Sequence, residues 1–284
     1  MTGLKSKKSP APEDKHHATL RWEDGQWRSL HSDAITPEWP LSIGIYDPQQ
    51  DETVDLAITM RTPGADEALI YGYLFTEGII HRASDIATVK LISPTEALVT
   101  LQPEVDFRPD NYHRFGYTNS SCGLCGKTDL EQLQRTFFHF PIPGKPTVSP
   151  AILTQLPDLL AQQQEVFGHT GGIHAAALFN TAGKLLALQE DVGRHNALDK
   201  LIGSSLQQAQ FPWRDKLVLL SGRISFELVQ KAASAGTPLL AAIGAPSSLA
   251  IQLAEENGIT LIGFLRQDRL NVYTYPERVV ASKS

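Results

Sequence analysis

Both cysteines of the 284-residue chain, Cys122 and Cys125, lie in one Cys-x-x-Cys pair within the segment SSCGLCGK. Only a thiolate is nucleophilic, and a Cys-x-x-Cys arrangement or a nearby cation such as Lys127 increases the thiolate fraction of a cysteine. Flanking glycines, Gly123 and Gly126, permit backbone conformations that other residues avoid. This segment therefore favours an exposed nucleophilic thiol on a Gly-rich loop. Such a thiol can accept sulfur by attacking a persulfide, in the same kind of exchange that disulfides undergo.

Three other interpretations of the cysteine pair remain open from the residues alone. A structural zinc site needs four ligands, and the chain offers two thiolates with only distant histidines such as His113 or His139. A dithiol–disulfide switch of the thioredoxin type normally follows a buried strand with an aromatic neighbour, which is missing here. The third interpretation is a pair of unreactive structural cysteines, but such cysteines are usually set among apolar residues, and these two are not. Zinc deaminase chemistry is disfavoured more strongly, because it needs His-x-Glu before Pro-Cys-x-x-Cys, and His174 is followed by two alanines.

A second group of residues lies where predicted strands give way to predicted helices. The segments are EDVGRHNALDK (190–200), LSGRISF (220–226) and IGAPSSL (243–249). In open α/β sheets, ligands bind outside the carboxyl ends of the strands, and free N–H groups at helix starts attract phosphate. These segments therefore predict an anion site, although helix caps and turns alone would give similar patterns. The candidate ligand-binding residues are Arg194, His195, Ser221, Gly222 and Arg223.

The elements that must position these residues follow from hydrophobic periodicity. Short apolar runs at 216–220, 238–243 and 260–265 alternate with helical patterns at 226–235 and 248–257, which is typical of buried parallel strands with crossover helices. Before them we expect strands at 175–179 and 185–188, a helix at 196–206, and a helix that Ser149 caps. In the first half, we expect strands at 19–22, 26–30, 39–46, 54–60, 87–92 and 97–101, and helices at 66–77 and 128–138, with Asp66 as the N-cap of the first and Asp24-Gly25 as a hairpin turn.

The predicted fold class is therefore α/β: a layered sheet with helices, plus a smaller N-terminal mixed α/β unit. The division is a disordered tail at 1–17, the N-terminal unit with the Cys-x-x-Cys loop at 18–145, and a C-terminal α/β domain at 146–284, with a Pro-rich linker at 141–146. A net charge of −6 argues against nucleic-acid binding. No apolar run is long enough to span a membrane and the N-terminus has no signal core, so we expect a cytoplasmic protein with reduced thiols.

Several of these segments together resemble one family. The motifs TMRTPG with the following DEALIYGYLFTEGII, SSCGLCGK, TGGIHAAAL, EDVGRHNALDKLIG, SGRISFELVQKAA and APSSLA closely resemble the formate dehydrogenase accessory sulfurtransferase family (FdhD), over roughly residues 40–275. The resemblance implies a cytidine-deaminase-like fold without the zinc chemistry, and a homodimer. It also implies sulfur transfer from a cysteine desulfurase to the molybdenum cofactor of formate dehydrogenase, a bis(guanine dinucleotide) molybdopterin.

The resemblance also assigns residues. Cys122 matches the cysteine that carries the persulfide and Cys125 matches its partner. The segment that matches the family's cofactor-contacting residues carries two arginines, which suit a phosphorylated ligand such as GDP; it comprises Phe264, Leu265, Arg266, Gln267, Asp268 and Arg269. Two competing functions stay open: a chaperone that holds the cofactor without transferring sulfur, and a thiol–disulfide oxidoreductase that would need both cysteines and no nucleotide.

Overall fold

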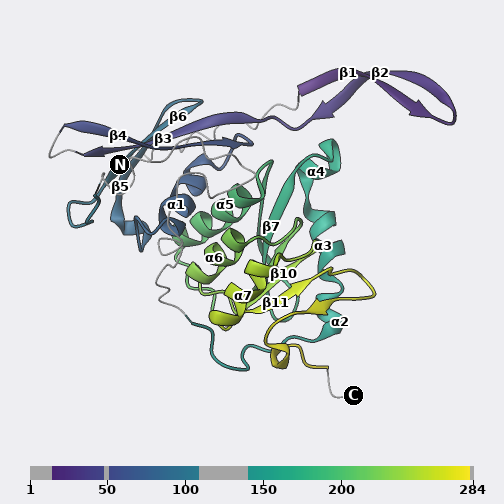
Figure 1. Cartoon of the computed structure of the whole chain (residues 1–284). Helices are drawn as coiled ribbons and strands as arrows, with labels where there is room; N and C mark the ends of the chain where they lie inside the picture. The colour runs from purple at the N-terminus through teal and green to yellow at the C-terminus, as the bar shows by residue number, and fades with distance from the viewer. Residues whose placement is uncertain (1–14, 48–50, 109–139, 282–284) are drawn as a thin grey trace, which may run out of the picture.

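The computed structural model describes residues 15–47, 51–108 and 140–281. These residues form a six-stranded sheet, a four-stranded sheet and a two-stranded ribbon, with helices packed on the two larger sheets (Figure 1). The predicted α/β class is therefore confirmed. No helix within the described ranges is long and apolar enough to cross a membrane.

The six-stranded sheet is formed by the second half of the chain, in the order β12-β11-β10-β9-β7-β8. Its parallel centre consists of β9 (Lys216–Leu220), β10 (Leu239–Ala242) and β11 (Thr260–Gly263), which confirms the crossover prediction. The flanking strands β7 (His174–Asn180), β8 (Leu185–Asp191) and β12 (Asn271–Val272) pair antiparallel with their neighbours. Only β12, which has two residues, was not expected from the sequence.

Helices cover both faces of this sheet (Figure 1). Along β9, Val218 and Leu220 pack toward α5 (Arg194–Gln207), α6 (Phe226–Ser234) and α7 (Ser248–Glu256). The alternate residues Leu217 and Leu219 pack toward α2 (Pro150–Leu153) and α3 (Leu156–Gln163). A short helix, α4 (Glu165–Thr170), follows α3. Because both faces are buried, the strand is a continuous apolar run, and each such side chain contributes about 1.5–3 kcal/mol by burial.

The N-terminal unit is a four-stranded sheet in the order β4-β3-β6-β5, covered by α1 (Asp66–Thr76). Its strands are β3 (Trp39–Asp47), β4 (Glu52–Arg61), β5 (Ile86–Ser93) and β6 (Glu96–Leu101), with a 3-10 helix at Ala83–Asp85 before β5. The prediction that Asp66 caps α1 is wrong. Ala65, with φ 52°, occupies the cap position. The carboxylate of Asp66 instead accepts two hydrogen bonds of 2.9 Å from the buried Arg61 guanidinium.

The two units meet where α1 packs on α5 without intervening side chains. A Cβ added to Gly72 of α1 would lie 1.8 Å from the carbonyl oxygen of Asp199, and one added to Gly203 of α5 would lie 1.8 Å from that of Ala68. Both helices therefore need glycine at the crossing. Beside it, Lys231 of α6 donates to the buried carboxylate of Asp199 at 2.8 Å, and Thr76 donates to the same carboxylate at 2.9 Å.

The first strands form a ribbon that extends away from the body (Figure 1). β1 (Lys15–Glu23) and β2 (Gln26–Ile35) are joined by the predicted turn, in which Asp24 and Gly25 both have positive φ. Trp22 and Trp27 face each other near the turn with ring centroids 5.3 Å apart. Because β1 begins at Lys15, the last three residues of the predicted disordered tail belong to a strand; residues 1–14 lie outside the described residues.

The expected linker is held against the C-terminal unit. The buried Arg278 donates to the carbonyl oxygens of Lys145 at 2.9 Å and Ile142 at 3.0 Å. Arg278 ends a 3-10 helix, Pro276–Arg278, far along the chain, and Val148 pairs with Val279 in an isolated bridge. The expected boundary at residue 145 therefore falls within a segment that contacts the C-terminal unit. Beyond it, Ser149 caps α2 as predicted, accepting from the Ile152 N–H at 3.3 Å.

Candidate functional site

The predicted strand-end segments meet at one edge of the six-stranded sheet. β9, β10 and β11 are parallel, so their carboxyl ends share that edge. β7 runs antiparallel to β9, which brings its first residue, His174, to the same edge, and β8 returns antiparallel so that Asp191 pairs with His174. The start of α5, which carries Arg194 and His195, therefore lies there too.

Backbone hydrogen bonds continue from strand to strand through these loops. The N–H of Gly244 donates to Gly222 at 3.0 Å, and the N–H of Phe264 donates to Gly244 at 3.0 Å. A Cβ on Gly244 would lie 2.6 Å from the Gly222 carbonyl oxygen. Glycine at 244 is therefore needed for one loop to approach the next.

Basic groups gather beside Gly222. A Cβ on Gly222 would lie 3.2 Å from His174 Nδ1 and 3.7 Å from Arg194 Cδ. Burial, with the positive charge of Arg194, lowers the pKa of His174. His174 is therefore neutral at neutral pH and can accept a hydrogen bond. Arg223, the next residue of the loop, is exposed.

Ser221 and Ser247 are engaged in structural hydrogen bonds. The Ser221 hydroxyl accepts from the Ala175 N–H at 2.8 Å, which ties β7 to the end of β9. Ser247 caps α7 by accepting from the Ala250 N–H at 3.2 Å. At these two positions the hydroxyl oxygens accept backbone hydrogen bonds that hold the loops at this edge of the sheet in place.

The segment 264–269 leaves β11 at the same edge, and its residues differ in exposure. Phe264 is 41% exposed and has a positive φ of 51°. A left-handed backbone at a bulky residue is strained, and such strain is frequent at functional sites. Leu265 is completely buried, so its side chain anchors the segment in the core.

The polar residues of this segment also differ in their partners. Arg266 donates from Nη1 to the carbonyl oxygens of Ile243 at 2.6 Å and Leu265 at 2.9 Å. Gln267 donates to Asp158 of α3. Arg269 and Asp268 are exposed, and the Arg269 carbonyl accepts from the Arg266 N–H at 2.8 Å, which closes a turn. Arg269 is thus the arginine of the segment best placed to meet a ligand.

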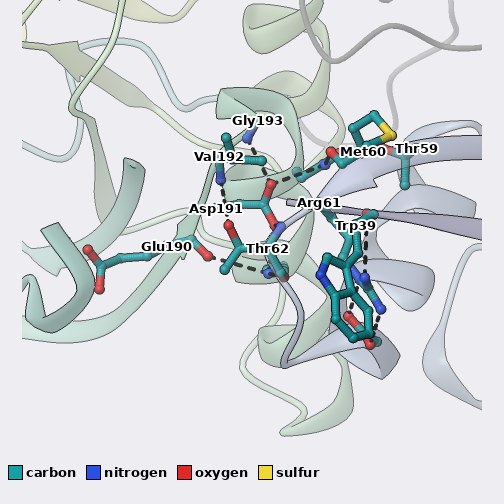
Figure 2. Close-up of polar contacts among 12 residues, drawn as sticks. Trp39, Thr59, Met60, Arg61, Thr62, Glu190, Asp191, Val192 and Gly193 are labelled. Atoms are coloured by element: carbon teal, nitrogen blue, oxygen red, sulfur yellow. Dashed lines mark hydrogen bonds and ion pairs between the residues drawn. The ribbon is translucent and has the colours of Figure 1, made fainter. Parts of the chain in front are cut away.

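Much of the segment EDVGRHNALDK holds the two units together (Figure 2). The Asp191 carboxylate lies 2.7 Å from Lys200 Nζ and accepts from the N–H groups of Thr62 at 3.1 Å and Gly193 at 2.8 Å. Burial raises the pKa of Asp191, and Lys200 opposes this effect. Asn196 donates to the Met60 carbonyl oxygen at 2.8 Å.

Glu190 has a different structural role. Its carboxylate accepts from the N–H groups of Val166 and Phe167, each at 3.1 Å. It thereby provides hydrogen-bond acceptors for two N–H groups in the first turn of α4, which have no partner within the helix. The two predicted ligand-binding residues of this segment are Arg194 and His195, and both lie at the strand edge.

Sequence reasoning missed two residues that contact the site, Ser225 and Glu227. His195 Nε2 lies 3.2 Å from Ser225 Oγ and 3.8 Å from Glu227 Oε2. The neighbouring His195 and Ser225 lower the pKa of Glu227 to about 2, against the opposing effect of burial. The only sequence signal was their place in SGRISFE, two and four residues after Arg223.

Cys122 and Cys125 lie outside the described residues, together with His113, His139 and the predicted helix at 128–138. Within the described ranges, no group of three His, Cys, Asp or Glu side chains is arranged to hold a metal ion. The described site is therefore an edge of an α/β sheet where Arg194, Arg223 and Arg269 accompany His174 and His195.

Comparison with known proteins identifies the family of this two-unit α/β protein. The FdhD/NarQ family matches residues 41–280, and the chain belongs to that family. The sulfur carrier protein FdhD of Streptomyces coelicolor is 46% identical over 271 residues, covering 92% of this chain and 93% of its own. The protein of the same name from Mycobacterium tuberculosis is 41% identical over 266 residues, covering 89% of this chain and 96% of its own.

A solved structure shares the fold. The crystal structure of a putative formate dehydrogenase accessory protein from Desulfotalea psychrophila superposes with a TM-score of 0.73, covering 94% of this chain and 99% of that one at 24% identity. The β1–β2 ribbon precedes the family match, whereas both cysteines and the whole strand-edge site fall inside it.

Proposed function

We propose that this protein is a sulfurtransferase that carries sulfur for formate dehydrogenase. It accepts sulfur from a cysteine desulfurase as a persulfide on Cys122, with Cys125 as its partner. It then delivers the sulfur to the Mo-bis(molybdopterin guanine dinucleotide) cofactor before that cofactor enters formate dehydrogenase. The family match carries this proposal, because it contains both cysteines and the strand-edge site, and because the relatives at 41–46% identity are named sulfur carrier proteins.

The loading step is a thiol exchange that balances without an added oxidant or reductant. The Cys122 thiolate attacks the terminal sulfur of the desulfurase persulfide. A new S–S bond forms at Cys122 as the donor's S–S bond breaks, and the donor cysteine leaves as a thiolate. A Gly-rich segment with Lys127 nearby suits this reaction because a cation favours the attacking thiolate.

The strand edge is the proposed binding site for the guanine nucleotide parts of the cofactor, which is the substrate of the delivery step. Phosphate oxygens prefer arginine partners. The exposed Arg223 follows β9 and the exposed Arg269 follows β11, with β10 between these two strands. The exposed ring of Phe264 offers a face on which a purine can stack. Calorimetry with GDP tests this part directly, since the dinucleotide shares that chemistry.

The combined proposal requires both the thiol and the binding edge. A chaperone without sulfur transfer would keep formate dehydrogenase active when Cys122 is changed to alanine. A thiol–disulfide oxidoreductase would not bind GDP. We therefore expect the Cys122→Ala variant to bind GDP normally and to leave formate dehydrogenase inactive, with the cofactor lacking its sulfur ligand. Full activation by this variant would overturn the proposal. The homodimer and the cytoplasmic location stay predictions, which sedimentation and cell fractionation test.

A further inference from the structure

The β1–β2 ribbon exposes three large apolar side chains near its turn. Leu20, Trp22 and Trp27 are 68%, 58% and 67% exposed, and we call these three residues the ribbon tip. They share one face of the ribbon, because Trp22 pairs directly with Trp27 and Leu20 lies two positions before Trp22 on the same strand. An isolated two-stranded hairpin is only marginally stable in water, and exposed apolar patches commonly mark contact surfaces. The ribbon tip therefore needs a surface to cover it.

The other end of the ribbon is fixed to the body of the protein. Pro37, which follows β2, is buried, and the hydroxyl oxygens of Thr36 and Thr170 lie 2.6 Å apart, within hydrogen-bond distance. Thr170 ends α4 and lies four positions before His174 of the strand-edge site. The ribbon thus starts beside that site and extends away from the body (Figure 1).

A second group of exposed apolar side chains surrounds the fixed end. Ile35 ends β2, Trp39 begins β3, and Phe167 lies on α4 one turn before Thr170. All three are exposed, and we call them the ribbon root. Trp27 and Ile35 are eight positions apart on β2, or roughly 25 Å at about 3.3 Å per residue. Because the ribbon itself separates them, one chain does not bring its own tip and root together.

We propose that the ribbon tip of one copy of this chain packs against the ribbon root of a second copy, in a twofold dimer that exchanges ribbons. In a twofold arrangement with antiparallel ribbons, each tip meets the other root, so both apolar groups of both chains are covered at once. The charges are also complementary, since Arg21 beside the tip and Glu38 beside the root are both exposed. Because the root adjoins the strand-edge site, each ribbon ends beside that site of the other copy.

The area involved is sufficient for a stable dimer. A fully covered aromatic side chain buries about 150–250 Å². With more than half of each tip side chain exposed, one tip supplies roughly 350 Å². Two tips and an equal area of the surfaces that they cover give roughly 1,400 Å², within the range of about 1,200–2,000 Å² for specific interfaces. This inference rests on the exposed groups and their positions, and it depends neither on the sulfur chemistry nor on the nucleotide site of the proposed function.

The first test is sedimentation equilibrium of the full chain over a range of concentrations. The wild type should dimerise. The Trp22→Ser/Trp27→Ser variant should raise the dissociation constant of the dimer by at least about a hundredfold, because tryptophans covered at an interface are among the residues whose loss weakens binding most. Phe167→Ser at the root should weaken the dimer as well. Leu249→Ser is the control, because Leu249 is exposed on α7, away from the ribbon (Figure 1), and this variant should dimerise like the wild type.

The second test identifies what covers the tip. A photoreactive phenylalanine analogue replaces Trp27, and chains labelled with heavy nitrogen are mixed with unlabelled chains before irradiation. Cross-links should join the tip of one isotope to peptides from 35–39 or 165–170 of the other.

Three results would overturn the inference: a wild type that is monomeric at every concentration, a dimer that the tryptophan substitutions leave intact, or cross-links confined to one chain. Cross-links to added formate dehydrogenase or cysteine desulfurase, with no dimer, would assign the ribbon to another protein and overturn it too. Loss of GDP binding or of persulfide loading in the wild type would contradict the proposed function and leave this test unaffected.

Discussion

Lys200 Nζ lies 2.7 Å from Asp191 Oδ2, and these two side chains are 2% and 0% exposed. The pair stands at the junction of the two units, because Lys200 also donates to the Thr62 carbonyl oxygen at 2.8 Å. Asp191 accepts from the Thr62 N–H (Figure 2). The segment EDVGRHNALDK, which suggests a ligand site on sequence grounds, therefore also holds the end of β4 in one unit against α5 of the other.

Replacing Lys200 by methionine should destabilise the fold strongly. The variant leaves the Asp191 carboxylate buried without its cation, which typically costs about 3–5 kcal/mol. Urea unfolding measures the loss. Lys216→Met is the matched control, since Lys216 pairs at 3.0 Å with Asp215, which is 80% exposed, and such pairs contribute less than about 1 kcal/mol. Equal losses in the two variants would contradict a special role for the Asp191–Lys200 pair.

Gly203→Ala should also destabilise the protein, by about 1–3 kcal/mol or more, because the added methyl group collides with the Ala68 backbone at 1.8 Å. Gly168→Ala on α4 is the control. A Cβ there meets nothing within 4 Å, and alanine favours helix over glycine by about 1 kcal/mol. Thermal unfolding should separate the two variants clearly. If Gly203→Ala matched Gly168→Ala, the close crossing of α1 and α5 would be wrong.

Local patterns predicted the elements well. The apolar runs of β9, β10 and β11 are continuous because both sheet faces are covered, and that pattern survives in the sequence alone. The turn at Asp24-Gly25 and the cap at Ser149 depend on neighbouring residues and were also predictable.

Side-chain contacts that residue types do not reveal account for what the sequence did not predict. Asp66 has a residue type that caps helices, but Arg61, five positions earlier, takes its carboxylate. Nothing near Arg278 in the sequence indicates that it binds carbonyl groups of residues 142 and 145. In the candidate site, Arg194 and His195 were identified from their position at a helix start. Glu227 was missed because its partner His195 lies 32 positions earlier in the chain.

Stability should depend on acid pH through Glu227. Its pKa falls from 4.5 to about 2 on folding, so the ionised carboxylate stabilises the folded state above pH 4.5. That contribution, about 1–2 kcal/mol after solvent screening, is lost as the pH falls from about 4.5 toward 2. Glu227→Gln should therefore show a shallower loss of stability over this range in urea titrations at successive pH values. The exposed Glu255→Gln serves as control and should parallel the wild type. Parallel curves for all three proteins would contradict the assignment.

Arg269→Ala should separate delivery from loading. If this exposed arginine contacts phosphate as proposed, its loss should weaken GDP binding by about tenfold or more, because hydrogen bonds to charged groups are the strong ones. Persulfide loading of Cys122 should be unchanged, and formate dehydrogenase should contain its cofactor yet remain inactive. Arg28→Ala on the ribbon is the control and should behave as wild type. Normal sulfur delivery by Arg269→Ala would show that this arginine is not part of the binding site.

The central claim is that Cys122 carries the sulfur. The most direct test is mass spectrometry of the full chain and its peptides after incubation with a cysteine desulfurase and cysteine, without reductant. The wild type should gain one sulfur atom that maps to Cys122, and Cys125→Ala should still gain it there. Cys122→Ala should gain none that is competent to activate formate dehydrogenase. A wild-type protein that activates formate dehydrogenase while Cys122 never acquires sulfur would contradict the account.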